Sequence, residues 1–292
     1  MIEFKNVSKN YDGFQAVSNL SFQLHKGEIL SLIGQNGAGK STTFHMLLDF
    51  IKPSNGQIHR NNNLNIGYMP EERGLYLKES IKSQMIYFAS LHGMKRVEAL
   101  EKLKIWMEKL NVVGDIEDKV ESLSKGNAQK VQLIACLMFN PDLLILDEPF
   151  SGLDPVNADL LIKAVLEAKK SGTMIIFSTH NMENVEKLSD YVVMLSHGKT
   201  VLKGTLKDIY NQFGRSKLDI VGYNNLQRFK GMNGIKDLAI TSENSAQLTL
   251  NDVSFGKYIF DEVTKDGYIP VFNQHYPTLD EIFKEKVKES EK

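Results

Sequence analysis

The chain has 292 residues, of which 42% are hydrophobic and 24% charged, with a formal net charge of −1, as in an ordinary folded protein. The balanced charge excludes a general electrostatic attraction to nucleic acid or to anionic lipid. No apolar run approaches the roughly 18–20 residues of a membrane-spanning helix. The start of the chain shows no signal peptide, so we expect a cytosolic protein.

The first 33 residues predict antiparallel strands that lead into a buried strand at 28–33. The strand before it is amphipathic with one irregular step, on Val17, Leu20, Phe22 and Leu24. Tyr11 lies in this opening sheet, where half-buried packing and stacking on a nucleotide base are both open interpretations.

A glycine-rich loop, Gly34-Gln35-Asn36-Gly37-Ala38-Gly39-Lys40-Ser41, joins the buried strand to a helix expected from Thr42. It fits the phosphate-loop pattern G-x-x-x-x-G-K-[ST] in the required strand–loop–helix context. Glycines let backbone N–H groups turn inward around an anion, and the helix N-terminus adds partial positive charge. We expect Lys40 to reach the β- and γ-phosphates and the Ser41 hydroxyl to hold Mg²⁺. The candidate nucleotide-binding residues are Gly34, Asn36, Gly37, Ala38, Gly39, Lys40, Ser41 and Thr42.

A polar loop begins after Tyr68, and apolar residues then recur at helical spacing over 78–111. No strand pattern appears before residue 142, so we expect a helical subdomain over about 72–140, inserted into an α/β core. Cys136 is the only cysteine and lies in an apolar run, which predicts a buried, inert thiol.

Buried strands alternate with helices from residue 141 to 213, which predicts a mostly parallel sheet covered on both faces. The expected fold class is therefore α/β, a phosphate-loop ATPase core with an antiparallel β subdomain, over residues 1–213. Residues 214–292 change to shorter elements and predict a small C-terminal α+β accessory domain. Its charged tail, from Lys284, is expected to fray.

Two carboxylates, Asp147 and Glu148, end the apolar strand at 143–146. In phosphate-loop ATPases an acidic residue at this place holds Mg²⁺, and a neighbouring carboxylate can orient or deprotonate the attacking water. Two solvated carboxylates at a strand end are the alternative. With the phosphate loop upstream, we assign Asp147 to the metal and Glu148 to catalysis.

Four further segments follow the order found in ABC-type ATPases, and residues 1–213 resemble that family. They are Tyr11 at the position that stacks on adenine, Leu123-Ser124-Lys125-Gly126-Asn127 at the LSGGQ signature, Ser151-Gly152-Leu153-Asp154 at the D-loop, and Ser178-Thr179-His180 at the switch histidine. A lone histidine at a strand end is more often a surface or core residue, but in this set we expect His180 to be catalytic.

The resemblance implies a mechanism that needs two chains. One chain binds ATP and Mg²⁺, and a second ABC ATPase chain, turned head to tail, places Ser124 and the Gly126 N–H on the γ-phosphate. His180 donates a hydrogen bond to the same phosphate. Because the signature precedes a helix, its N–H groups suit an anion. Hydrolysis should therefore require a homo- or heterodimer.

Two positions depart from the family pattern. Glu71 stands where the family has a glutamine near Mg²⁺ and the attacking water. A carboxylate there can approach the metal but is repelled by the γ-phosphate. Lys125 replaces the first signature glycine and Asn127 the final glutamine. Lys125 either strengthens phosphate attraction across the interface or points to solvent. We expect an active but slow ATPase.

The run at 66–76, which contains Pro70-Glu71-Glu72-Arg73-Gly74-Leu75-Tyr76, is similar to a bacterial subgroup with a PEERGLY loop. That subgroup serves exporters of drugs, ions or peptides whose membrane subunits are separate polypeptides. Residues 278–283 resemble it too, and exporters of phenol-soluble-modulin-type peptides are one alternative within it.

The leading hypothesis is the ATPase subunit of a membrane exporter, held at the cytoplasmic face of the membrane by an integral membrane subunit, with no nucleic-acid partner. ATP-driven closure of two chains would move a helix of that subunit seated near residues 71–87. One alternative is a soluble ABC ATPase that acts on DNA, on ribosomes or in cluster assembly. However, Lys40 and Ser124 are too close in sequence for an inserted coiled coil, and the chain has one cassette. The other alternative is a weakly catalytic regulatory cassette of a heterodimer.

Overall fold

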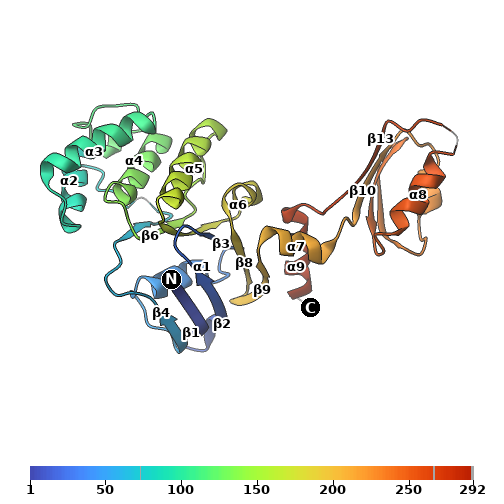
Figure 1. Ribbon diagram of the computed structural model, residues 1–292, viewed down its shortest axis with the longest axis horizontal. Helices are drawn as coiled ribbons and strands as arrows, with labels where there is room; N and C mark the ends of the chain where they lie inside the picture. Colours follow the sequence, from blue (N-terminus) through green and yellow to red (C-terminus); the bar gives the residue numbers. More distant parts are fainter. Residues whose placement is uncertain (73, 266, 291–292) are drawn as a thin grey trace. The chain divides into compact units, whose positions relative to one another are not determined.

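The computed structural model describes residues 1–72, 74–265 and 267–290 and divides the chain into two compact units, Met1–Thr205 and Leu206–Lys292 (Figure 1). The boundary expected at residue 213 is the end of helix α7 (Leu206–Phe213), which this division places in the second unit. Each unit is described by itself below.

A nine-stranded sheet organises the first unit, in the order β4-β1-β2-β9-β8-β3-β7-β6-β5. Its second half is parallel and consists of β8 (Tyr191–Ser196), β3 (Ile29–Gly34), β7 (Met174–Thr179), β6 (Leu143–Asp147) and β5 (Ile66–Met69). All residues of β3, β6 and β7 are buried, as expected for a sheet covered on both faces. The prediction of a mostly parallel α/β core is therefore confirmed.

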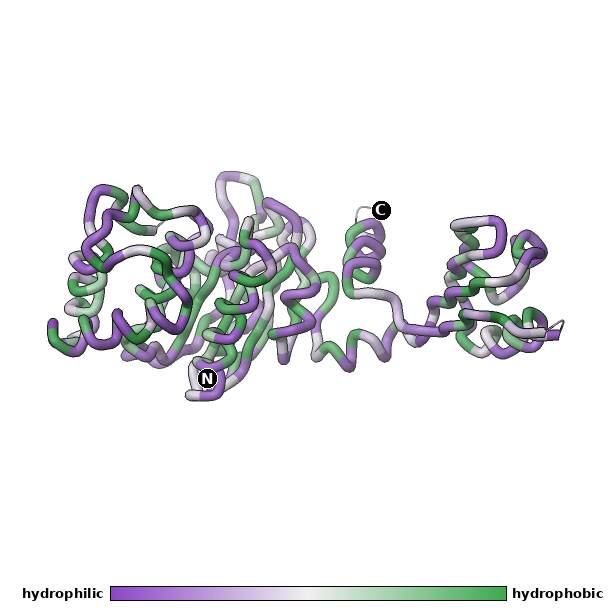
Figure 2. The backbone as a smooth tube through the Cα atoms, turned by 90° about the horizontal axis from the view of Figure 1, so that it is seen from above, coloured by the Kyte–Doolittle hydropathy of each residue, from purple (hydrophilic) through white to green (hydrophobic). Residues whose placement is uncertain are grey.

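Alternate residues of the parallel strands enter two different hydrophobic clusters. Leu144 and Leu146 of β6 pack with apolar residues of α2 to α5. Leu143 and Ile145 pack with α1 and with the first two strands. Because successive strand residues point to opposite faces, one strand is buried from both sides. Figure 2 shows hydrophobic segments running through these packed strands.

The other half of the sheet contains the predicted antiparallel subdomain, although β2 and β9 pair in parallel. β1 (Ile2–Tyr11) pairs with β2 (Phe14–Leu24) and with β4 (Asn55–His59), and β8 forms a hairpin with β9 (Lys199–Gly204). The rings of Phe4 and Phe22 stack at 4.4 Å between centroids. A two-residue turn joins β1 to β2, with positive φ at Asp12 and Gly13, as the tight hairpin requires.

Helices flank the sheet and fill the segment between β5 and β6. They are α1 (Lys40–Leu47), α2 (Ile81–Leu91), α3 (Arg96–Lys109), α4 (Lys125–Leu137), α5 (Pro155–Lys170), α6 (Met182–Leu188) and the short η1 (Val120–Ser122). Between residues 70 and 142 the described residues form no strand, so this insertion is helical as expected (Figure 1). The side chains of Ser80, Ser124 and Asp154 accept backbone hydrogen bonds at the starts of α2, α4 and α5, which satisfies donors that a helix leaves free.

The second unit contains a four-stranded antiparallel sheet in the order β11-β12-β10-β13. The strands are β10 (Lys217–Val221), β11 (Ile235–Ser242), β12 (Ser245–Leu250) and β13 (Val271–His275). Helix α8 (Phe255–Val263) and the short η2 (Leu226–Phe229) share its hydrophobic core, to which Leu218, Leu248 and Ile259 belong.

A last helix, α9 (Leu279–Ser290), contains the charged segment that was expected to fray. Leu279, Ile282 and Val287 are buried along it, and the Lys286 ammonium lies 5.5 Å from the ring centre of Phe213 on α7. These contacts account for helical structure as far as Ser290.

Candidate active site

The loop between β3 and α1 encloses open space at the end of the parallel sheet. Gly39 has a φ of 102°, and a Cβ there would lie 2.5 Å from the Ala16 carbonyl oxygen, so close packing on β2 requires glycine. Gly37 also has a positive φ, of 80°, but a Cβ there would meet nothing within 4 Å. A pocket of about 240 Å³ lies here, lined by Asn36, Gly37, Gly39, Lys40, Ser41, Thr42, Glu71, Asp147 and Glu148.

Most of the candidate nucleotide-binding residues therefore converge on one pocket. Gly34 and Ala38 do not line it. Gly34 ends β3, where a Cβ would lie 2.6 Å from the Leu195 carbonyl oxygen, and Ala38 is buried. These two residues shape the loop.

The Lys40 side chain folds back over this loop. Its Nζ donates to the carbonyl oxygens of Gly34 at 2.8 Å and Gln35 at 3.2 Å, and the residue is only 7% exposed. The loop carbonyls therefore fix the ammonium group at the pocket, where it provides a positive charge for a phosphate group.

Oxygen atoms from two elements meet beside the lysine. The Ser41 hydroxyl, at the start of α1, donates to Asp147 Oδ2 at 3.2 Å, and the Ser178 hydroxyl donates to the other carboxylate oxygen, Asp147 Oδ1. A hydroxyl and a carboxylate are ligands that Mg²⁺ accepts, with phosphates and water completing its shell. No group of three or more His, Cys, Asp or Glu able to hold a metal occurs among the described residues. The donor set therefore fits a metal bound together with a phosphate ligand.

Tyr68, on β5, is a further neighbour of this carboxylate. Burial, followed by the negative charge of Asp147, raises the pKa of the Tyr68 phenol to about 12. The phenol therefore stays neutral beside the carboxylate at physiological pH.

Glu148 is buried, and hydrogen-bonding groups contact both its backbone and its carboxylate. It is 7% exposed, its N–H donates to the Ser178 hydroxyl at 3.0 Å, and its Oε1 lies 3.0 Å from Nδ1 of His180. Its φ of 49° is in the left-handed region, which is uncommon for a residue with a side chain. The His180 side chain is 72% exposed. One face of this pair is therefore open to a ligand.

The signature residues lie at the N-terminus of α4. The Ser124 hydroxyl accepts a hydrogen bond from the Asn127 N–H at 3.3 Å, and a Cβ on Gly126 would lie 3.5 Å from Leu153. Neither Ser124 nor Gly126 lines the phosphate pocket of its own chain. The exposed Lys125 side chain lies beside Gly152.

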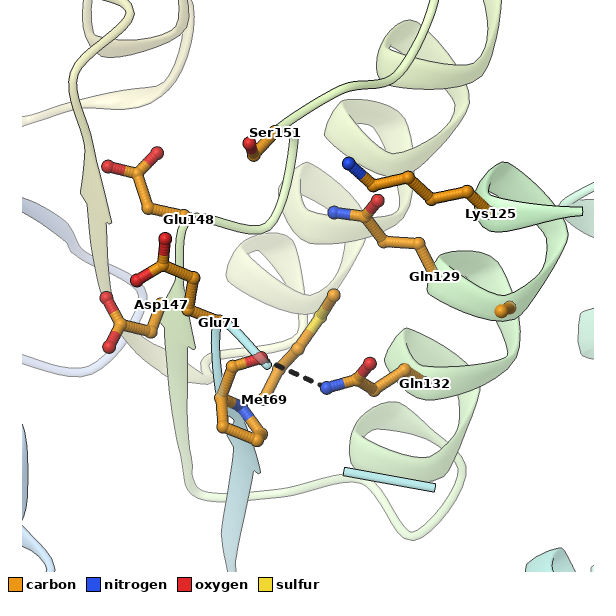
Figure 3. A pocket seen from close by; sticks show the side chains of 10 residues that line it. Met69, Glu71, Lys125, Gln129, Gln132, Asp147, Glu148 and Ser151 are labelled. Atoms are coloured by element: carbon orange, nitrogen blue, oxygen red, sulfur yellow. Dashed lines mark hydrogen bonds between the residues drawn. The ribbon is translucent and has the colours of Figure 1, made fainter. Parts of the chain in front are cut away.

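A second pocket, of about 170 Å³, adjoins the first (Figure 3). Three carboxylates, Glu71, Asp147 and Glu148, line both pockets. Figure 3 shows Lys125, Gln129 and Gln132 extending from α4 toward the carboxylates and Ser151. Gln129, Gln132 and Ser178 were not predicted to be site residues. The spacing of 125, 129 and 132 on one helix face was the available signal. Arg73, part of the PEERGLY run, lies outside the described residues.

Tyr11 is the last residue of β1 and is 43% exposed at the hairpin tip, where it pairs with the exposed Phe14. The Lys9 ammonium lies 5.1 Å from its ring centre. The ring is therefore about half-buried, as expected for strand packing, and its exposed part leaves a surface on which a planar ligand could stack.

Comparisons with known proteins agree with this geometry. Residues 17–151 match the model of the ABC transporter family, and residues 204–287 match that of the C-terminal domain of DrrA1-3-like ATP-binding proteins. The chain is 40% identical to the uncharacterized ABC transporter ATP-binding protein YhaQ of Bacillus subtilis (strain 168), over 98% of each chain.

It is also 30% identical to the linearmycin resistance ATP-binding protein LnrL of the same organism, over 73% of this chain and 72% of LnrL. Among solved structures, an ATP-binding subunit of an ABC transporter is 31% identical, with a TM-score of 0.68, over 73% of this chain and 93% of that one.

Proposed function

This chain belongs to the ABC transporter ATP-binding family and is an ATPase, and we propose that it powers a membrane exporter as one half of an ATP-closed dimer. The observation that carries the proposal is the convergence of Lys40, Ser41, Asp147 and Glu148 on the phosphate-loop pocket.

ATP would bind with its phosphates in this pocket and its adenine on the exposed Tyr11 ring. Lys40 Nζ, which now donates to two loop carbonyls, would turn to the β- and γ-phosphates. Ser41 and Asp147 would hold Mg²⁺, with Glu71 near it. When bound, the metal would neutralise charge that develops on the phosphates.

Hydrolysis needs a general base and a hydrogen-bond donor near the γ-phosphate. Glu148 is the candidate base, because its carboxylate borders the pocket and its backbone is fixed by Ser178. Such a carboxylate orients and deprotonates the attacking water. Nδ1 of His180 lies 3.0 Å from Oε1 of Glu148, and the ring would donate a hydrogen bond to the γ-phosphate through Nε2.

Ser124 and Gly126 form a half-site, meaning a set of phosphate donors that would complete the ATP site of another chain, and this supports a dimer. These residues are absent from the pocket of their own chain, yet they begin a helix of 13 residues, whose N-terminal N–H groups attract anions. A second chain turned head to tail would bring them to the γ-phosphate. Two ATP molecules would then be enclosed between two chains.

Membership of the ABC transporter family supports a role in transport. We propose export because LnrL, a relative of 30% identity, is named for linearmycin resistance, which removal of that compound from the cell would provide. No helix within the described residues is long and apolar enough to cross a bilayer. We therefore propose that an integral membrane subunit holds the chain at the cytoplasmic face of the membrane. A groove of about 350 Å³ beside the exposed Tyr76 and Tyr87 would receive a helix of that subunit.

A complementation experiment tests the composite site. Lys40→Ala removes the phosphate ligand and Ser124→Arg blocks the half-site, so each variant alone should lose at least about 100-fold in ATP turnover. An equimolar mixture should recover part of the activity, because one intact composite site forms. Lys257→Ala, in the second unit, is the matched control and should behave like the unaltered chain. Full turnover by Lys40→Ala, or no recovery in the mixture, would overturn the proposal.

A further inference from the structure

One face of α4 contacts two loops, one that carries Glu71 and one that carries Glu148. Lys125, Gln129 and Gln132 are spaced i, i+4 and i+7, which places them on one side of a helix. Figure 3 shows all three directed into the second pocket. The same helix begins at Ser124, the half-site proposed to contact the nucleotide of another chain.

Gln132 holds the Glu71 loop through its backbone. Its side-chain amide nitrogen donates to the carbonyl oxygens of Pro70 at 3.1 Å and Glu72 at 3.3 Å. A primary amide has two N–H groups, so both are used, one on each side of Glu71. The residue is 7% exposed, which keeps water from replacing these bonds easily.

Glu71 has no comparable support of its own. Its side chain makes no ion pair or hydrogen bond with any described residue. The place of its carboxylate therefore depends on the path of the backbone from Pro70 to Glu72, which Gln132 fixes.

Gln129 makes the corresponding contact on the other loop. Its side-chain nitrogen donates to the carbonyl oxygen of Pro149 at 2.5 Å, one residue beyond Glu148. One helix turn thus separates the amide that holds the Glu148 loop from the amide that holds the Glu71 loop.

We propose that Gln132 is a positioning residue of ATP hydrolysis: by bracketing Glu71 it sets where that carboxylate stands relative to the metal and the attacking water. Together with Gln129 it fastens α4 to both carboxylate loops. A shift of α4 when Ser124 meets the nucleotide of the second chain is then transmitted to the loops of Glu71 and Glu148. This inference rests on the proposed function, in which Glu71 lies beside Mg²⁺.

The main variant is Gln132→Leu, which keeps the side-chain volume but has no donor. Its kcat should fall about 10-fold, because misplacement of a group near the reacting atoms costs rate. Its KM for ATP should stay within about 2-fold, because the phosphate loop is untouched. Thr173→Val is the matched control. It also removes a buried side-chain-to-backbone hydrogen bond, from Thr173 Oγ1 to the Pro141 carbonyl at 2.9 Å, but at the far ends of β6 and β7, so kcat should be unchanged.

A double-mutant cycle decides whether Gln132 acts through Glu71. In a Glu71→Ala background, Gln132→Leu should change kcat by less than about 2-fold, because the group it positions is gone. Equal fold losses in both backgrounds, or no loss in either, would overturn the inference. If Gln132→Leu fails to fold, Gln132→Asn keeps the amide one methylene shorter, and the same cycle applies. If Lys40→Ala is inactive but Gln132→Leu has an unchanged kcat, this inference is overturned and the proposed function stands.

Discussion

Nδ1 of His180 lies 3.0 Å from Oε1 of Glu148, although the two residues follow different strands of the sheet. Strands β6 and β7 are parallel neighbours, and their pairing of Asp147 with Ser178 brings the two loops together. Strand pairing therefore places the two side chains together at the edge of the phosphate pocket.

Replacing Glu148 by glutamine should separate binding from hydrolysis. The amide keeps the size of the side chain but is not a base, so kcat should fall at least about 100-fold, while ATP affinity stays within about 2-fold. Steady-state turnover and nucleotide titration measure the two quantities. Similar rates for Glu148→Gln and the unaltered chain would remove Glu148 as the catalyst and favour a weakly catalytic regulatory cassette.

Asp147→Asn should weaken the dependence of ATP binding on magnesium. The carboxylate accepts hydrogen bonds from Ser41 and Ser178, and its charge is the feature that attracts a divalent cation. The Mg²⁺ concentration for half-maximal ATP binding should rise about 10-fold or more. Binding of ATP in the presence of a chelator should change little, and an equal loss with and without Mg²⁺ would contradict the assignment.

Tyr11→Ala should weaken ATP binding through loss of base stacking. Stacking of one base on an aromatic ring contributes about 1–3 kcal/mol, so Kd should rise roughly 5- to 160-fold, and Tyr11→Phe should restore it. Tyr268→Ala, at an exposed ring in the second unit, serves as the control. An unchanged Kd for Tyr11→Ala would mean that the adenine lies elsewhere.

The thiol of Cys136 should be unreactive in the folded protein. Burial raises its pKa from the ordinary value of 9.0 to about 12, so the folded state keeps the proton at pH values where the unfolded state loses it. The contribution of this thiol to the free energy of unfolding is therefore fully present below pH 9 and is lost as the pH rises from 9 to about 12. A thiol reagent at pH 8 should label less than about a tenth of the native protein, and one equivalent after guanidinium unfolding. Rapid labelling of the native chain would contradict the burial.

The phosphate loop, the carboxylates and the helical insertion were predictable because each has a local pattern. Strand β5 was missed because it has only four residues and lies beside the polar loop. Strand β11 was missed because only Ile235 is buried along it, so it lacks the alternation of a half-buried strand. The C-terminal part of helix α9, from Lys284, was expected to fray because charged residues predominate in it, although Leu279, Ile282 and Val287 are buried along the helix.

The site was predictable as a set of residues but not as an arrangement. Motif order indicated that Lys40, Ser41 and Asp147 belong together. Nothing local indicated that Gln132 would hold a loop about 60 positions earlier in the chain, because that contact depends on how α4 packs. The partner of Ser124 is proposed to lie on another chain, so folding a single chain leaves it undetermined.

The left-handed backbone conformation of Glu148 lowers the folding stability of the chain at a residue proposed to act in ATP hydrolysis. Holding a side-chain-bearing residue at a φ of 49° costs on the order of 1 kcal/mol or more, which glycine would avoid. A chain selected only to resist heat would carry glycine at that position. This chain instead has a glutamate there, whose carboxylate lines the phosphate pocket.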